Sequence, residues 1–372
     1  MKVAIALSGG VDSAVAAHLL KQQGYDVFAL FMKNWEEKTP SNRCSAERDF
    51  RDIIDICQLL NIPYYAVNFS KLYWERVFEE FLAGIKRGFT PNPDVLCNRE
   101  IKFSVLYDRA RELGADYLAT GHYCRTKNGL LFKGKDLAKD QSYFLHAVKP
   151  AVFKRVLFPL GELTKKEVRS IAQDIGLSVS DKKESMGICF IGKRRFQPFL
   201  ARYLAAQKGV IETVDGHMIG THVGAIYYTI GQRKGLGIGG PGEAYFVVDK
   251  DIERNVVVVA QGPNHPALFA EALVANDVSW IASPPMLPLR CSAKIRYRQA
   301  DQPCRVEAAP NGAVRVIFDK PQRAITRAQS VVFYRRETCL GGGVIVEIDS
   351  PAHACAGASK NTSLITTQNK AQ

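Results

Sequence analysis

The sequence has no apolar run that approaches the length of a membrane-spanning helix, which needs about 20 residues. The apolar stretch nearest the first residue is VAIAL. Gly9, Gly10 and Asp12 interrupt it before it can form the core of a signal peptide. From these two absences we expect a cytoplasmic protein with no membrane partner.

Cysteine is present, but never in the spacing that metal sites and disulfide frameworks use. The nine cysteines are an odd number and include no CxxC pair, which argues against a zinc site and against structural disulfides. His217 and His222 lie in a strand-rich segment and do not make a metal-binding pair. We therefore predict no metal-ligating cluster and expect most cysteines to be small, buried apolar residues.

Negative charge is scarce relative to positive charge. The chain has 50 Lys and Arg against 37 Asp and Glu, a net charge of +13 at pH 7. This excess favours a polyanionic partner, because Lys and Arg bring affinity for phosphate backbones without selecting a sequence. At 372 residues the chain is long enough for two or three domains with separate cores.

One glycine-rich turn is the most informative feature of the sequence. The letters SGGVDS, residues 8–13, follow the apolar run 3–7 and open a segment, 11–23, with apolar residues at helical spacing. A second apolar run at 25–32 completes a βαβ unit. A plain tight turn uses the same residue types. A glycine turn at a helix N-terminus, however, is typical of an anion site, because free N–H groups and the helix dipole favour negative charge.

Two common phosphate motifs are missing from this turn. No lysine follows Gly10, as a Walker loop requires, and a dinucleotide fingerprint needs a third glycine. The turn resembles instead the SGGxDS signature of the PP-loop ATP pyrophosphatases, which cleave ATP to AMP and pyrophosphate. In that interpretation Gly9 and Gly10 let phosphates approach the backbone. Ser8 and Ser13 donate hydroxyl hydrogen bonds, and Asp12 holds the helix start or a magnesium ion.

The order of the remaining elements predicts an α/β domain followed by two β-rich units. Apolar runs at 62–69 and 115–123 alternate with amphipathic helical patterns at 48–61, 99–114 and 164–176. This alternation is typical of a parallel sheet covered on both faces.

Beyond about residue 200 the pattern changes to short strands and turns, typical of compact β structure and of a small antiparallel barrel. We expect a catalytic domain at 1–200, a central β-rich domain at 201–272, a C-terminal barrel at 273–350 and a loose tail at 351–372.

The letters GLGIGG at 235–240 match a dinucleotide fingerprint. Pro241, Gly242 and the strand-like AYFVV follow, however, where that site needs a helix. We interpret this segment as a flexible loop that contacts RNA phosphates or braces the active site.

Two cysteines stand in settings that favour a thiolate, the nucleophilic form of cysteine. Cys97 lies just before an expected helix, with Asp94 three residues earlier, and Cys189 precedes a basic run at 193–195. Helix N-termini and nearby Lys or Arg stabilise thiolates. From the residues alone, two structural cysteines are the simpler interpretation, because free cysteines are usually buried.

Seven further motifs occur in the order found in one family. LFMKNWEE, TPNPDVLCNREIKF, GADYLATGHY, KDQSYFL, GICFIG, YYTIGQRKGLGIGG and RYRQAD resemble the motifs of the bacterial tRNA-specific 2-thiouridylases, the MnmA family, over about residues 1–348. The chain departs from the family pattern at Met186, where a small hydroxyl residue is expected. It departs again at Arg327 and Ala328, where Pro-Gly is expected.

The resemblance implies an ATP-dependent sulfurtransferase that converts the wobble uridine of tRNA to 2-thiouridine. The uracil 2-carbonyl oxygen would attack ATP to form an adenylate and release pyrophosphate, and AMP would leave when sulfur arrives. Sulfur would be carried as a persulfide on Cys189. Cys97 would release it as sulfide or resolve it as a Cys97–Cys189 disulfide, with Asp94 as general base or orienting group.

The resemblance also assigns binding residues and partners. The ATP site comprises Ala6, Leu7, Ser8, Gly9, Gly10, Val11, Asp12, Ser13, Met32 and Gly121, with Mg2+ as the expected companion of ATP. The tRNA contacts are Asn92, Pro93 and Asp94 for the target base, and Lys139, Asp140, Gln141, Arg296 and Tyr297 elsewhere. Implied partners are the tRNAs for Glu, Gln and Lys and a persulfide-carrying donor protein.

Simpler interpretations and two other functions stay open. Without the resemblance, residues 139–141 are an exposed turn, residues 296–299 are a solvated strand face, and His122 is a hydrogen-bonded structural histidine. A PP-loop ligase acting on a small molecule explains SGGVDS but not the basic charge, the barrel or the two cysteines. A non-catalytic tRNA-binding module does not explain why Asp12, Cys97 and Cys189 are all intact.

Overall fold

The computed structural model describes residues 1–35, 45–180, 182 and 196–349. The N-terminal domain is built on a five-stranded sheet in the order β3-β2-β1-β4-β7, in which every neighbouring pair is parallel. This confirms the predicted α/β domain with a parallel sheet. The strands are β1 (Lys2–Leu7), β2 (Asp26–Lys33), β3 (Tyr64–Asn68), β4 (Tyr117–Thr120) and β7 (Val156–Leu157).

Alternate residues of β1 face two separate cores, as expected for a strand that is covered on both sides. Val3 and Ile5 pack in one core with three helices. Ala4 packs in the other core, with Phe103 and Leu106. The three helices of the first face are α1 (Val11–Gln22), α2 (Ser45–Leu60) and α7 (Lys165–Asp174).

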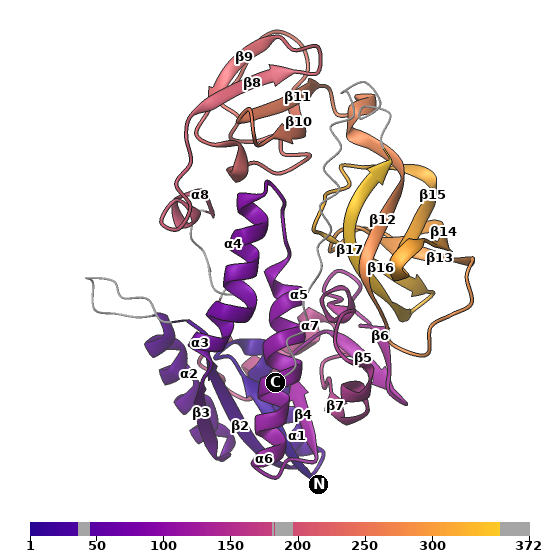
Figure 1. The fold of residues 1–372 in the computed structure, drawn as a ribbon. Coiled ribbons are helices and arrows are strands. Elements are labelled where there is room, and N and C mark those ends of the chain that lie inside the picture. Colours follow the sequence, from indigo (N-terminus) through magenta and orange to yellow (C-terminus); the bar gives the residue numbers. More distant parts are fainter. Residues whose placement is uncertain (36–44, 181, 183–195, 350–372) are drawn as a thin grey trace, which may run out of the picture.

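Two long helical stretches lie side by side between the sheet and the middle domain, the first running away from the sheet and the second back to it (Figure 1). Their apolar faces form a shared core that includes Phe78 and Phe81 of the first stretch and Ile101 of the second. The first stretch consists of α3 (Ser70–Tyr73), the π-helical η1 (Trp74–Phe78) and α4 (Glu79–Lys86). The second consists of α5 (Pro93–Cys97), the π-helical η2 (Asn98–Val105) and α6 (Leu106–Glu112).

The middle domain is a four-stranded sheet in the order β10-β11-β8-β9, in which β11 and β8 are parallel and the other pairs antiparallel. The loop 235–240 leads into β10, a strand, so GLGIGG lacks the helix that a dinucleotide site needs. The strands are β8 (Gly209–Thr213), β9 (Met218–His222), β10 (Tyr245–Asp251) and β11 (Val256–Gln261).

The C-terminal domain is a closed antiparallel barrel, as predicted. Its strand order is β12-β15-β14-β13-β16-β17, and pairing of β12 with β17 closes the ring. The barrel stands beside the N-terminal domain (Figure 1). The strands are β12 (Phe269–Trp280), β13 (Leu289–Lys294), β14 (Gln302–Ala308), β15 (Val314–Arg323), β16 (Ser330–Arg335) and β17 (Thr338–Asp349).

A hairpin from the N-terminal part of the chain extends the barrel sheet. Its strands are β5 (Cys124–Lys127) and β6 (Leu130–Lys133), and β6 pairs with β17. Within the described ranges, no helix combines the length and apolarity that crossing a membrane requires. The short helices are η3 (Ser142–Leu145), η4 (Pro150–Arg155), α8 (Phe196–Leu200), η5 (Ala225–Tyr227), η6 (Pro266–Leu268) and η7 (Pro310–Gly312).

Candidate active site

The predicted PP-loop is the turn between β1 and α1, and its own hydroxyl groups fix its shape. Ser13 Oγ accepts from the Ser8 N–H at 3.1 Å and donates to the Gly10 carbonyl at 3.1 Å. Gly9 has a φ of 72°, in the left-handed region that favours glycine. Gly10 is the N-cap of α1 and brings no side chain over the first turn. An anion can therefore approach the helix N-terminus at this position.

Asp12, in the first turn of α1, is held by two groups from distant elements. Its Oδ1 accepts from the Tyr123 hydroxyl at 2.7 Å and from Lys165 Nζ at 2.7 Å. The Lys165 side chain is only 10% exposed. It is the first residue of α7, where Thr164 and Glu167 form a capping box. A helix start therefore fixes a positive charge beside the loop.

A second lysine contacts the loop from the segment after α7. Lys182 Nζ donates to the Gly9 carbonyl at 3.0 Å and pairs with Asp52 Oδ2 at 2.6 Å. Together with Lys165, it brings two ammonium groups to the turn. Each ammonium group is paired with a carboxylate, Asp12 or Asp52. Lysine is a common phosphate ligand, so both lysines lie where they can contact the phosphates of a nucleoside triphosphate bound at the turn.

Gly121, which follows β4, forms a close wall against the PP-loop. A Cβ added to it would lie 2.9 Å from the Ser13 nitrogen and 3.0 Å from the Asp12 carbonyl carbon. Both neighbours are backbone atoms, so glycine is required for this approach. Met32 lies on β2 next to β1, and it packs against the same core as Ala6.

Cys97 does not stand just before a helix, as we expected. It is the last residue of α5, and η2 continues directly from it. The free N–H groups at the start of α5 belong to residues before Cys97, so this part of the prediction is wrong. The Cys97 side chain is 1% exposed and lies in the core shared by the two long helical stretches.

The turn before Cys97 is fixed by Asn92. Its Oδ1 accepts from the Asp94 N–H at 3.1 Å and from the Val95 N–H at 3.4 Å. Pro93 occupies the first helical position, which suits a residue without an N–H. Asn92 therefore caps α5 and fixes the backbone of the three residues predicted to contact the target base.

A buried acceptor lies directly after Cys97. Asn98 is 2% exposed, and its Nδ2 donates to the Phe144 carbonyl at 3.1 Å. Among the described residues its Oδ1 has no hydrogen-bond partner. An unpaired buried acceptor is costly, so a ligand N–H is a suitable partner for it.

Cys189 lies outside the described residues, as do Met186 and the basic run 193–195. The predicted electropositive setting of Cys189 and its approach to Cys97 therefore stay predictions.

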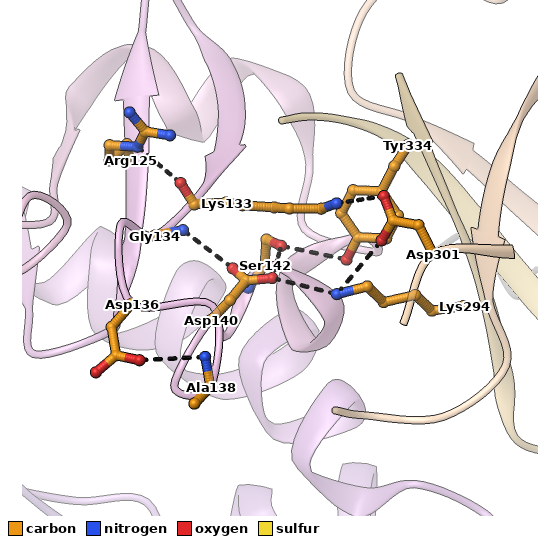
Figure 2. Close-up of polar contacts among 10 residues, drawn as sticks. All are labelled: Arg125, Lys133, Gly134, Asp136, Ala138, Asp140, Ser142, Lys294, Asp301 and Tyr334. Carbon is orange, nitrogen blue, oxygen red and sulfur yellow. Dashed lines mark hydrogen bonds and ion pairs between the residues drawn. The ribbon is translucent and has the colours of Figure 1, made fainter. Parts of the chain in front are cut away.

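Asp140 lies inside a polar network between the N-terminal domain and the barrel (Figure 2). Its carboxylate accepts from the Gly134 N–H at 3.1 Å, and from the N–H and hydroxyl of Ser142 at 3.1 and 2.9 Å. The side chain is 2% exposed. Lys139 and Gln141, on either side of it, are partly exposed. Of the three predicted tRNA contacts in this segment, Asp140 is thus the one that faces inward.

Two buried lysines complete this network. Lys133 Nζ pairs with Asp301 at 2.5 Å, and Lys294 Nζ lies 3.8 Å from Asp140 and 3.7 Å from Asp301. Both ammonium groups lie near the Tyr334 ring, 4.4 and 5.1 Å from its centroid. The two positive and two negative groups balance, as buried ions require. They join β6 and the loop after it to the barrel.

Gln141 extends the connection toward the PP-loop. Its N–H donates to the Tyr123 carbonyl at 3.0 Å, and its Oε1 accepts from the Tyr123 N–H at 3.0 Å. The Tyr123 hydroxyl in turn holds Asp12. Residues 139–141 therefore lie between the barrel and the PP-loop.

Arg296 and Tyr297 lie in the segment between β13 and β14 and are half-buried. Arg296 donates to the carbonyls of Ala324 and Ile230, and burial lowers the pKa of its guanidinium. The Tyr297 ring packs against Phe144, with centroids 4.5 Å apart. Both side chains therefore brace neighbouring loops, and their contact with tRNA stays a prediction.

His122 is a buried histidine with a hydrogen-bond partner. Its Nδ1 lies 2.7 Å from Thr120 Oγ1. Burial, with a smaller effect from Lys102, holds its pKa well below the ordinary histidine value. His122 is therefore neutral at pH 7.

Three residues of the site were not predicted from the sequence: Tyr123, Lys165 and Lys182. Tyr123 ends the GADYLATGHY motif, and Lys165 opens a helix with a capping box, so both lie in recognisable local patterns. Their contacts with Asp12 span 111 and 153 residues. Only the tertiary fold reveals them.

Family models match the chain in three consecutive parts. Residues 1–193 match a model described as tRNA methyl transferase HUP domain. Residues 197–261 match the tRNA methyl transferase PRC-barrel domain, and residues 270–345 match the aminomethyltransferase beta-barrel domain.

Full-length relatives match at high identity. A tRNA-specific 2-thiouridylase MnmA from Protochlamydia amoebophila is 54% identical over 348 residues, covering 92% of this chain and 93% of the relative. The protein of that name from Francisella philomiragia is 52% identical over 355 residues, covering 93% and 99%. Among solved structures, a 4-thiouridine synthetase–RNA complex with bound ATP matches with a TM-score of 0.33 and 20% identity. That match covers 54% of this chain and 49% of that one.

Proposed function

The chain belongs to the MnmA family of tRNA-specific 2-thiouridylases and is a tRNA sulfurtransferase, and from this premise we propose that it thiolates the wobble uridine through an ATP-derived adenylate. The domain models carry descriptions that mention methyl transfer. The relatives that match over nearly their whole length are named thiouridylases, so we propose thiolation and not methyl transfer.

The observation that carries the ATP step is the charged setting of the PP-loop. A glycine-capped helix N-terminus, Lys165 on Asp12 and Lys182 on the Gly9 carbonyl lie together at the end of β1. Such fixed positive charges favour pyrophosphate as the leaving group, because they act where negative charge develops. Asp12 Oδ2 accepts nothing from the described residues and is suited to hold Mg2+ on the phosphates, which would neutralise further charge.

The adenylate is needed because uracil has no good leaving group at C2. The 2-carbonyl oxygen of uracil is a poor leaving group, so sulfur cannot displace it directly. When that oxygen attacks the α-phosphate of ATP, a C2–O–AMP bond forms and pyrophosphate departs. Sulfur then adds to C2 and AMP leaves with the former uracil oxygen.

We assign the sulfur chemistry to Cys189 and Cys97. Cys189 carries the sulfur as a persulfide, and Cys97 attacks Cys189 Sγ, which forms a Cys97–Cys189 disulfide. The outer sulfur is released either as free sulfide or already bonded to C2 of the activated uridine, and an external thiol reduces the disulfide before the next turnover. Cys97 is buried at 1% exposure, so the target base must leave its stack to reach it. Asp94, one turn earlier in α5, takes up the uracil N3 proton or orients the base.

We infer an RNA partner from the net charge of the chain and from the positions of its candidate contact residues. The net charge of +13 suits a phosphate backbone, and we place tRNA against Lys139, Gln141 and the Arg296–Tyr297 segment. Arginine pairs phosphate and tyrosine stacks on unpaired bases. The tRNAs for Glu, Gln and Lys and a persulfide-carrying donor protein complete the proposed reaction.

The test is nucleoside mass analysis of tRNA after incubation with the protein, ATP and a small-molecule persulfide. We expect 2-thiouridine at the wobble position, formed only when ATP is present, together with AMP and pyrophosphate. ADP and phosphate in place of AMP would overturn the PP-loop assignment, and a thio group at another base would overturn the substrate assignment.

The two cysteines are distinguished by the order of their steps. Cys189→Ser should accept no persulfide sulfur and make no 2-thiouridine. Cys97→Ser should load labelled sulfur on Cys189 and fail to deliver it. If Cys97→Ser thiolates tRNA at the normal rate over many turnovers with reductant present, Cys97 is a structural residue.

A further inference from the structure

Two thiols that the proposed reaction does not use face each other inside the barrel. Cys291 of β13 and Cys304 of β14 are direct partners across an antiparallel ladder, and their sulfur atoms lie 3.8 Å apart. Residues paired in this way point to the same face of the sheet. Both side chains accordingly pack in the barrel core.

The backbone positions suit a disulfide. Directly opposite residues in an antiparallel pair have Cα atoms about 4.5–5.5 Å apart, within the range of about 4.4–6.8 Å that disulfides use. The sulfur atoms need only a modest side-chain rotation to come within bonding distance. No strand has to separate or change register for the bond to form.

The two thiols differ in access and in acidity. Cys304 is fully buried, whereas Cys291 is partly exposed. The hydrogen bond between them lowers the pKa of Cys291, with a smaller effect from Arg335, and raises that of Cys304, which burial raises further. Cys291 therefore ionises first and is also the thiol that a reagent can reach. The thiolate is the attacking form in thiol–disulfide exchange.

Three other cysteines of the described chain lack the exposure and the lowered pKa of Cys291. Cys57, Cys124 and Cys339 are buried, and burial raises the pKa of each thiol, to about 11 for Cys57 and about 12 for Cys339. They serve as unreactive internal standards for the barrel pair.

We propose that Cys291 and Cys304 form a reversible redox-active pair, with Cys291 as the entry thiol and Cys304 as the resolving thiol. The Cys291 thiolate attacks a low-molecular-weight disulfide, forming a mixed disulfide and releasing one thiol. Cys304 then attacks Cys291 Sγ of the mixed disulfide, which forms the Cys291–Cys304 bond and releases the second thiol. The small disulfide is reduced and the protein pair is oxidised by two electrons.

The position of the pair gives the bond a structural consequence. Residues 295–301, which include Arg296 and Tyr297, connect β13 to β14 immediately beyond it. A Cys291–Cys304 bond closes a short covalent loop around that segment, which limits separation of the two strands. Oxidation should therefore slow hydrogen exchange in β13 and β14 relative to the distant strands β8 and β9.

The experiment uses full-length protein carrying Cys97→Ser and Cys189→Ser, so that the proposed catalytic thiols cannot react. The folded protein is incubated with oxidised glutathione, blocked with an alkylating reagent and digested with trypsin. Cleavage after Arg290, Lys294, Arg298 and Arg305 gives the peptides 291–294 and 299–305. We expect these two peptides to be linked, the link to be lost on adding reduced glutathione, and the peptides of Cys57, Cys124 and Cys339 to stay unlinked.

Two further variants test the order of events. Cys304→Ser should leave Cys291 carrying a stable glutathione adduct, and Cys291→Ser should leave Cys304 unmodified in the folded protein. Because Cys304 is buried, Cys304→Ala is measured beside Cys304→Ser as a second variant that lacks the thiol. A thermal unfolding curve of each variant checks that it is folded. The proposal is overturned if the two peptides link only after unfolding, or if Cys291 takes up no glutathione when Cys304 is absent from a folded protein.

Discussion

At the scale of single residues, Lys165 is the side chain whose loss should most affect ATP chemistry. Lys165→Met keeps most of the apolar stem but removes the buried charge on Asp12. We expect AMP formation to fall about 100-fold or more, the cost typical of losing one fixed group that stabilises developing charge. The measurement is the initial rate of AMP release in the presence of tRNA.

The neighbouring lysine supplies a matched control. Lys166 occupies the next position of α7 and is exposed. Lys166→Met should leave the rate of AMP release within about twofold of the wild type. Equal losses in the two variants would show that Lys165 acts through general charge rather than through its contact with Asp12.

Gly24 and Ala328 both have a left-handed backbone, and substitutions at these two residues should change the free energy of unfolding in opposite directions. Gly24 has a φ of 81°, and a Cβ added to it would meet no atom within 4 Å, so Gly24→Ala tests conformation alone. We expect it to lower the free energy of unfolding by about 1 kcal/mol. Ala328, where the family pattern expects glycine, has a φ of 64°. Ala328→Gly should raise it by about 0.5 kcal/mol, because relief of strain outweighs the added freedom of the unfolded chain.

Urea unfolding of the two variants beside the wild type measures both changes. A stabilising Gly24→Ala or a destabilising Ala328→Gly would contradict the strain argument at that position.

At the scale of elements, the start of α7 determines where the Lys165 charge lies. Thr164 accepts from the Glu167 N–H, and Glu167 accepts from the Thr164 N–H, which completes the capping box. Thr164→Ala should cost about 1 kcal/mol of stability and should slow AMP release, because Lys165 is the next residue. Unfolding curves and AMP rates of the purified variant measure both effects.

Thr164→Ser keeps the capping oxygen and should retain both stability and rate. If Thr164→Ala loses stability at an unchanged AMP rate, the cap supports the helix without positioning Lys165.

The elements that could be predicted from the sequence are those with a strong local pattern. The alternation of apolar runs and amphipathic helices indicated the parallel sheet, and the short alternating strands indicated the barrel. The hairpin of β5 and β6 was not predicted, because its strands have four residues each and its pairing with β17 is remote in sequence. The helix around Cys97 was predicted too short at its start, since Pro93 and the Asn92 cap extend it back past the cysteine.

The same distinction applies to the candidate site. The PP-loop has its motif in one continuous segment, so Asp12 and its glycines could be predicted as candidate residues from the sequence alone. The partners of Asp12 come from α7 and from the segment between β4 and β5, more than 100 residues away. Asp140 was predicted as an RNA contact from its motif, whereas the structure buries it beside Lys294 of β13. The contacts of Asp12 and the burial of Asp140 depend on residues that are distant in sequence, so the sequence could not predict them.

At the scale of the whole molecule, acid should weaken the junction between the N-terminal domain and the barrel. His146 Nε2 lies 2.9 Å from Ser330 Oγ of β16, and burial, with a smaller effect from Arg99, lowers the pKa of His146 to about 4. The unfolded chain, with an ordinary histidine pKa, binds a proton between pH 6.5 and pH 4, where the folded protein does not. Stability from this group is therefore complete above pH 6.5 and is lost as the pH falls toward 4.

We expect the loss to reach about 3 kcal/mol at pH 4. Urea unfolding at a series of pH values, compared between wild type and His146→Gln, separates the contribution of His146 to stability from those of the other buried histidines. The variant should show a shallower fall in stability between pH 6.5 and pH 4. Parallel curves would show that another group governs the acid response.

The central claim is that ATP activates the uracil oxygen, and the fate of that oxygen tests it most directly. A synthetic tRNA with oxygen-18 at O2 of the wobble uridine is thiolated in ordinary water, and the AMP and pyrophosphate are analysed by mass spectrometry. If the oxygen attacks the α-phosphate and leaves with it, each 2-thiouridine formed yields one AMP that carries oxygen-18, and the pyrophosphate carries none. Thiolation accompanied by unlabelled AMP would contradict the adenylate mechanism and the role assigned to the PP-loop.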